Sequence, residues 1–132
     1  MMVDPQTIVQ SFYDALGRGD VPAIVELLDT QVTWTEAESF PYYSGTWTGP
    51  QAVIDNLLVP ISRDWEQFAA RPHSFVAYGS QVVGFGKYSG IYKRTGKSMS
   101  AAFAHLWSVR DGKITSFDMF TDTAKVLEAT RA

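Results

Sequence analysis

Three side chains capable of acid–base chemistry, Glu36, Tyr88 and His105, lie where the sequence pattern turns them inward. Glu36 ends a short alternating run, and Tyr88 and His105 each lie within a longer run rich in strand-forming residues. A carboxylate beside an imidazole and a phenol provides a base next to two hydrogen-bond donors. Such a group could move a proton close to a carbonyl and stabilise the negative charge that forms on its oxygen.

Glu36 is the candidate base. Residues 32–36 alternate as a strand does, so Glu36 faces inward if Val32 and Trp34 do. Burial beside rings raises the pKa of a carboxyl group, because desolvation disfavours its charged form. The alternative is an exposed Glu36 at a strand end, solvated together with Glu38.

His105 belongs to a predicted hairpin over residues 100–122 that folds back at residues 110–112. Glycine in the third place of Arg-Asp-Gly favours a three-residue loop with a bulge, a register that opposes His105 to Phe117. Both faces are largely apolar, so we expect the hairpin to be covered on both sides. One face carries Phe103, His105, Trp107, Phe117 and Met119, and the other carries Ala102, Ala104, Leu106, Ile114 and Phe120.

The chemistry of His105 has two interpretations at this point. An inward imidazole can donate a hydrogen bond or serve as a second acid–base group. It can equally be a core histidine satisfied by a backbone or hydroxyl partner. A metal site has little support, because His73 is the only other histidine and the sequence has no cysteine.

Tyr88 lies on the same side of its predicted strand as Gly84, Gly86 and Gly90. Glycine inside a strand often marks a bend or the close approach of a ligand or of another chain segment. Tyr88 is therefore either a phenol donor in a narrow space or a packed aromatic residue whose hydroxyl meets water.

Composition limits the classes of function. The 132 residues suffice for one domain with its own core, and we expect a single domain over residues 1–132. Aromatic residues make up 14% of the chain, which indicates a ring-rich core or a cavity lined by rings. The net charge of −3 and the scattered Lys and Arg argue against a nucleic-acid partner. Without a long apolar run or a leader pattern, we expect no membrane partner and a cytoplasmic location.

Periodicity and capping signals place the helices and strands. The expected helices cover residues 5–17, 21–28, Pro50 to about Leu58, ending before Pro60, and a short segment from about Thr123, capped by Asp122. Between them, residues 37–50 form a loop with four rings, which should fold over something apolar. Residues 65–76 are ambiguous, and the sheet strands are expected over 74–77, 81–93, 98–109 and 115–121.

Helices followed by a curved antiparallel sheet form an α+β pattern. With these elements the chain resembles the NTF2-like family, specifically its SnoaL-like and ketosteroid-isomerase-like branch. The likeness runs over nearly the whole chain and rests on Phe12, Gly19-Asp20, Leu27-Leu28, Trp34, Tyr43, Gly45, Gly49-Pro50, residues 105–114 and residues 120–123. It implies N-terminal helices packed on a strongly curved sheet that encloses a conical pocket.

The resemblance also implies roles. Glu36 stands where ketosteroid isomerases carry their carboxylate base, and His105 stands where they carry a protonated Asp that donates to the oxyanion. The implied ligand-binding residues are Phe12 or Tyr13, together with Trp34, Phe103, Phe117 and Met119. The aromatic residues Tyr43, Trp47 and Trp65 are either further pocket wall or core. The Arg and Asp residues of limonene-epoxide hydrolases fall on Gly86, Tyr88 and Met119, which argues against epoxide hydrolysis.

The leading hypothesis is cofactor-free proton transfer on a hydrophobic carbonyl compound, of the isomerase or polyketide-cyclase type. Glu36 would be the base, and His105 and Tyr88 would polarise the carbonyl. One alternative is a non-catalytic module that binds a hydrophobic ligand in the same cone, and another is an interaction domain whose cavity is filled by its own rings. The resemblance further implies a homodimer through the outer face of the sheet.

Overall fold

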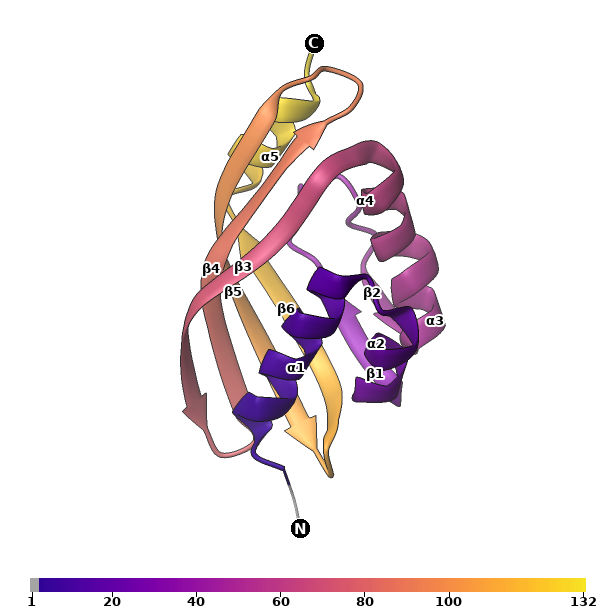
Figure 1. Cartoon of the computed structure of the whole chain (residues 1–132), viewed down its shortest axis with the longest axis vertical. Coiled ribbons are helices and arrows are strands. Elements are labelled where there is room, and N and C mark those ends of the chain that lie inside the picture. Colours follow the sequence, from indigo (N-terminus) through magenta and orange to yellow (C-terminus); the bar gives the residue numbers. More distant parts are fainter. Residues whose placement is uncertain (1–2) are drawn as a thin grey trace.

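The computed structural model describes residues 3–132 and packs helices against one six-stranded sheet (Figure 1). The strand order is β2-β1-β6-β5-β4-β3, and every neighbouring pair is antiparallel except β1 with β6. The strands are β1 (Leu28–Thr35), β2 (Thr46–Thr48), β3 (Trp65–Tyr78), β4 (Gln81–Tyr92), β5 (Ser98–Arg110) and β6 (Lys113–Thr121). The expected α+β class is confirmed.

Helix α1 (Pro5–Arg18) lies across one face of the sheet, and α2 (Val21–Leu27) follows it (Figure 1). Helix α1 begins with proline, which has no backbone N–H, at a position where that group would have no partner within the helix. Gly19 ends the helix in the left-handed conformation, which glycine adopts without strain. The apolar side of α1 is buried against the sheet. Its buried residues are Ile8, Val9, Phe12, Tyr13 and Ala15.

The helix that begins at Pro50 does not end before Pro60, contrary to the prediction. It comprises α3 (Pro50–Val53), the π-helical segment η1 (Ile54–Leu58) and α4 (Val59–Asp64). Proline is tolerated in the first turn of a helix, and the change from π to α geometry places Pro60 in the first turn of α4. The chain therefore stays helical up to the start of β3.

Strand β3 begins at Trp65, nine residues before the strand predicted over 74–77. Its pairing with β4 is irregular between Glu66 and Ala69 and again between Pro72 and Ser74. Each irregularity shifts the alternation of inward and outward residues, so no single period of two runs along the strand. This shift explains why its sequence is ambiguous.

The β5–β6 hairpin has a different register from the predicted one. His105 opposes Met119, not Phe117, because the loop contains only Asp111 and Gly112, both with positive φ. An irregularity between Ser108 and Val109 takes up the remaining residue. The two predicted faces hold except for Ile114, which is buried in the core and does not lie on the outer face.

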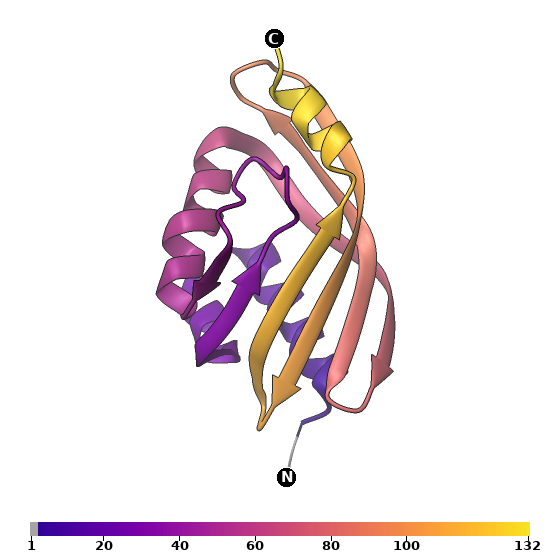
Figure 2. The ribbon, with the colours of Figure 1, turned by 180° about the vertical axis from the view of Figure 1, so that it is seen from behind.

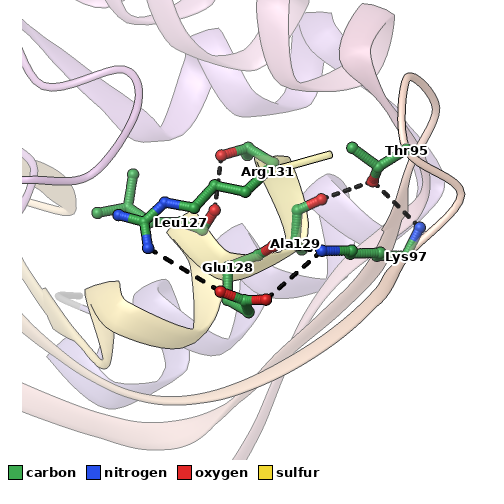
Figure 3. A network of polar contacts seen from close by, with 7 residues as sticks. Thr95, Lys97, Leu127, Glu128, Ala129 and Arg131 are labelled. Carbon is green, nitrogen blue, oxygen red and sulfur yellow. Dashed lines mark hydrogen bonds and ion pairs between the residues drawn. The ribbon is translucent and has the colours of Figure 1, made fainter.

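Helix α5 (Thr123–Thr130) covers one end of the sheet, with Asp122 capping it as predicted. Its last turn is tied to the loop between β4 and β5 (Figure 3). Thr95 donates a hydrogen bond to the carbonyl of Ala129 at 2.6 Å, and Lys97 pairs with Glu128 at 3.4 Å. Within residues 3–132, no helix lies over the middle of the outer face of β4, β5 and β6 (Figure 2). None of the described helices is long and apolar enough to cross a membrane.

Candidate functional site

The space between α1 and the sheet is occupied by rings from five elements. The ring planes of Trp34 and Phe117 are stacked with their centroids 3.9 Å apart, and those of Phe103 and His105 lie at the same separation. We call this group the aromatic cluster; its members are Phe12, Tyr13, Trp34, Tyr88, Phe103, His105, Trp107 and Phe117, all buried. The predicted inward face of the hairpin thus forms the floor of the cluster.

His105 lies at the centre of the cluster, with a phenol on each ring nitrogen. The hydroxyl of Tyr13 is 2.6 Å from Nδ1, and the hydroxyl of Tyr88 is 2.6 Å from Nε2. Burial holds the pKa of His105 well below its usual range, because the imidazolium would be cut off from water. A neutral imidazole has one donor and one acceptor nitrogen, so one phenol donates to His105 and the other accepts.

Both phenols stay protonated at neutral pH. Burial raises the pKa of the Tyr13 hydroxyl, although the indole N–H of Trp107, which donates to it at 3.2 Å, partly offsets this effect. Burial also raises the pKa of Tyr88, and the nearby Glu36 carboxyl raises it further. The pair can therefore provide hydrogen-bond donors.

Glu36 follows directly after β1 and is only 5% exposed, so its predicted inward orientation is confirmed. The indole N–H of Trp34 donates to Oε2 at 3.0 Å. Burial raises the pKa of Glu36 to about 8, and the bond from Trp34 only partly offsets this. Glu36 is thus largely a neutral acid at pH 7 and becomes a carboxylate on mild alkalinisation.

Four of the predicted lining residues lie outside the aromatic cluster. Met119 is buried beside the cluster, opposite His105. Trp47 is half-buried in β2 and pairs with Trp34 across the β1–β2 ladder. Tyr43 is 39% exposed, which gives no support to its predicted place in the pocket lining.

Trp65 is buried, but its polar atom faces the loop after β1. Its indole N–H donates to the Tyr42 hydroxyl at 3.1 Å, and Tyr42 donates to Asp64 at 2.9 Å. Phe40 is buried as well. The aromatic loop is therefore fastened to the end of α4 and the start of β3, as the prediction of a loop over apolar groups requires.

Trp107 is the main site residue that sequence reasoning did not assign. The alternation of the hairpin already places it on the inward face, but only the fold shows that it bonds to Tyr13. Of Phe12 and Tyr13, which the resemblance offers as alternatives, the structure buries both. The contact of Phe68 with Tyr88 has no signal in the sequence, because the irregularities of β3 hide the direction of its side chains.

The surface of residues 3–132 includes two hollows beside β3. One, of about 320 Å³, lies between α1 and β3 and is lined by Gln10, Tyr13, Asp14, Pro72 and Phe75. The other, of about 460 Å³, lies over β3, β4 and β5. Only the first reaches a hydrogen-bonded member of the aromatic cluster, Tyr13. Among residues 3–132, no group of three His, Cys, Asp or Glu side chains is arranged to hold a metal ion.

Comparison with protein families decides the classification. The family described as the SnoaL-like domain matches residues 9–117. The chain belongs to the SnoaL-like family. No curated protein matches this SnoaL-like chain.

Solved structures confirm the NTF2-like fold. An NTF2-like protein from Burkholderia thailandensis is 34% identical, with a TM-score of 0.94 over 99% of this chain and 100% of that one. TerC, co-crystallized with polyporic acid, is 24% identical, with a TM-score of 0.85 over 97% and 98% of the two chains. A candidate polyketide cyclase from Xanthomonas campestris is 20% identical, with a TM-score of 0.84 over 96% of each. The last two share the fold with this SnoaL-like chain.

Proposed function

We propose that this SnoaL-like protein binds a hydrophobic carbonyl compound and catalyses a cofactor-free proton transfer on it, of the isomerase or polyketide-cyclase type. The observation that carries the proposal is the burial of Glu36, with its raised pKa, in the same aromatic interior as the His105–Tyr88 pair. TerC supports it, because a protein of this fold was co-crystallized with a small organic acid, polyporic acid.

In this proposal Glu36 is the base. Its carboxylate form removes a proton from the carbon next to the carbonyl and later returns it at another position. Tyr88 donates to the carbonyl oxygen as negative charge develops there, with His105 behind it. Exclusion of bulk water strengthens both interactions, since the surrounding rings provide few competing dipoles.

Substitution of Glu36 tests the proposal. Glu36→Gln keeps the size and the acceptor for the Trp34 indole but cannot take up a proton. We expect the variant to lose turnover, by at least about 100-fold, and to keep its ligand affinity, measured by rate assays and by equilibrium binding with the same carbonyl compound. Glu38→Gln, at an exposed position two residues away, is the matched control and should retain full activity. Undiminished turnover in Glu36→Gln would contradict the proposed base.

A non-catalytic binding module is the second candidate. It is favoured by the fact that the polar groups of the interior already have partners, Trp34 for Glu36 and two phenols for His105. A binder would release its ligand unchanged after long incubation. Recovery of an isomerised or cyclised product would instead favour the enzyme.

We further infer that residues 1–132 form one SnoaL-like domain that pairs with a second copy through the outer face of the sheet. Phe85, Ala104 and Phe120 follow one another across β4, β5 and β6 on that face. Phe120 is 57% exposed and Phe85 39%, so this apolar row is open to solvent in the single chain.

A further inference from the structure

The hydrogen bonds around His105 form one connected chain of four residues. Trp107 contacts Tyr13 at 3.2 Å, Tyr13 contacts Nδ1 of His105 at 2.6 Å, and Nε2 of His105 contacts Tyr88 at 2.6 Å. The first link has a fixed direction, because an indole N–H can only donate. The direction of the remaining links depends on which nitrogen of His105 carries the proton.

We infer that Trp107 and Tyr13 hold His105 in the tautomer with the proton on Nε2, which makes Tyr88 a hydrogen-bond donor to the interior. In this arrangement the Tyr13 hydroxyl accepts from Trp107 and donates to Nδ1, while Nε2–H donates to Tyr88. Each hydroxyl oxygen then accepts one bond. All donors are used except the hydroxyl proton of Tyr88.

The opposite tautomer distributes the bonds less evenly. The oxygen of Tyr13 would accept from both Trp107 and Nδ1–H, and its own proton would have no acceptor among residues 3–132. Tyr88 would spend its proton on Nε2. Each tautomer leaves one phenol proton free, but here that proton belongs to the oxygen that already accepts two bonds, in the confined space beside Gly84, where a Cβ would lie 2.9 Å from the Tyr13 hydroxyl.

Among the hydrogen bonds of residues 3–132, the Tyr88 hydroxyl has no partner besides His105, so in this tautomer its proton is available to a ligand. Glu36 is near enough to influence the ionisation of Tyr88, so the hydroxyl shares the interior with that carboxyl group. Bonds that run in one direction polarise one another, which strengthens the last donor in the chain. Trp107 and Tyr13 are therefore positioning residues that act on Tyr88 through His105.

This polarity selects the ligand, an inference that rests on the proposed use of the interior as a binding site. Tyr88 presents a donor, and Glu36, with Oε2 bonded to Trp34, presents a second one while it is protonated. A flat apolar compound with an acceptor oxygen, such as an aryl ketone or a quinone, satisfies both donors. An ammonium ion or another donor-only group satisfies neither.

The tautomer can be measured in the ligand-free protein by ¹⁵N NMR with labelled histidine. His73→Gln leaves His105 as the only histidine, so the two ring-nitrogen signals need no further assignment. We expect one neutral form, with a proton on Nε2 and none on Nδ1. A proton on Nδ1, or a mixture of both forms, would overturn the inference.

Removing the fixed donor tests the cause. Trp107→Phe deletes the N–H that biases the chain, so we expect a mixture of tautomers in place of one. Trp47→Phe, in β2, is the matched control and should leave the spectrum of His105 unchanged. If folded Trp107→Phe keeps the pure Nε2–H form, Trp107 does not set the direction. The result for the parent protein stands even if this variant fails to fold.

The ligand preference is tested by equilibrium binding of two matched probes. We expect 2-acetylnaphthalene to bind about five-fold more tightly than 2-ethylnaphthalene, which lacks the acceptor, and Tyr88→Phe to remove most of that difference. Equal binding of the two probes, or no binding of either, would overturn the inferred ligand class. Neither experiment requires turnover. Failure of the proposed catalysis would be recognised separately, by undiminished turnover in Glu36→Gln.

Discussion

At the scale of single residues, the chain buries groups whose charged forms would be costly. Burial favours neutral Glu36 and neutral His105, and each preference makes stability depend on pH in an opposite sense. Because the pKa of Glu36 is raised in the folded chain, its contribution to stability is complete below the carboxyl pKa of the unfolded chain. It declines as pH rises from there toward the carboxyl pKa of the folded chain. A lowered imidazole pKa gives stability that declines as pH falls below 6.5.

The stability of the protein should therefore fall as pH rises from about 7 to about 8, where His105 is neutral in the folded chain and mostly neutral in the unfolded one. In this window Glu36 is ionised in the unfolded chain and protonated in the native one, so unfolding releases a proton. The free energy of unfolding should drop by up to about 1.4 kcal/mol per pH unit. Urea titrations at several pH values measure this slope.

Glu36→Gln provides the comparison, because it has no proton to lose. We expect its stability to be nearly flat over the same window. A slope that is equally steep in Glu36→Gln would assign the pH dependence to another group and would contradict the raised pKa of Glu36.

At the scale of elements, regular patterns predicted the fold and local irregularities escaped prediction. The period of α1 and the alternation of β4 and β5 gave these elements nearly their observed bounds. The start of β3, the continuation through Pro60 and the register of the hairpin were wrong, because each depends on a bulge, a π segment or a two-residue turn. Such features insert or remove one residue from a repeat and leave little trace in composition.

The inward glycines of β4 were expected to mark a bend or the close approach of a ligand or of another chain segment. At Gly86 the structure shows the last of these. A Cβ on Gly86 would lie 2.2 Å from the carbonyl oxygen of Arg71 and 2.7 Å from Cα of Pro72. The close approach is therefore that of the neighbouring strand β3, next to its register irregularity between Pro72 and Ser74. The Phe103 ring, 2.6 Å from the same point, also occupies this space.

Gly86→Ala should accordingly destabilise the protein by about 3 kcal/mol or more, because backbone atoms cannot move aside as a flexible side chain can. Gly17→Ala is the matched control: its Cβ would meet nothing within 4 Å inside α1. The control should stabilise by about 0.5–1 kcal/mol, since alanine is the better helix former. Urea unfolding of both variants measures the difference, and a tolerated Gly86→Ala would contradict the described packing.

At the scale of the whole molecule, the sequence predicted only part of the arrangement of the candidate site. Alternation predicted which face of each strand points inward, and so placed Glu36, Tyr88 and His105 in one interior. It could not predict which nitrogen of His105 meets which phenol, because those contacts join α1, β4 and β5 across long sequence separations. The exposure of Tyr43 was not predicted either, because a loop has no period that fixes the direction of its rings.

The outer face leads to the last prediction, that the protein is a dimer in solution. Phe120 and Phe85 flank Ala104 on adjacent strands, and no described helix covers the middle of this face (Figure 2). Pairing with a second copy would bury these rings, and a charge in their place would remain without a partner. Phe120→Asp should therefore shift the protein to a monomer in sedimentation equilibrium while its circular dichroism stays unchanged.

Tyr78→Asp, at the end of β3 and 87% exposed, is the control and should remain dimeric. Sedimentation of the unmodified protein as a monomer at micromolar concentration would rule out a stable pairing through this face, and the row of rings would then need another partner.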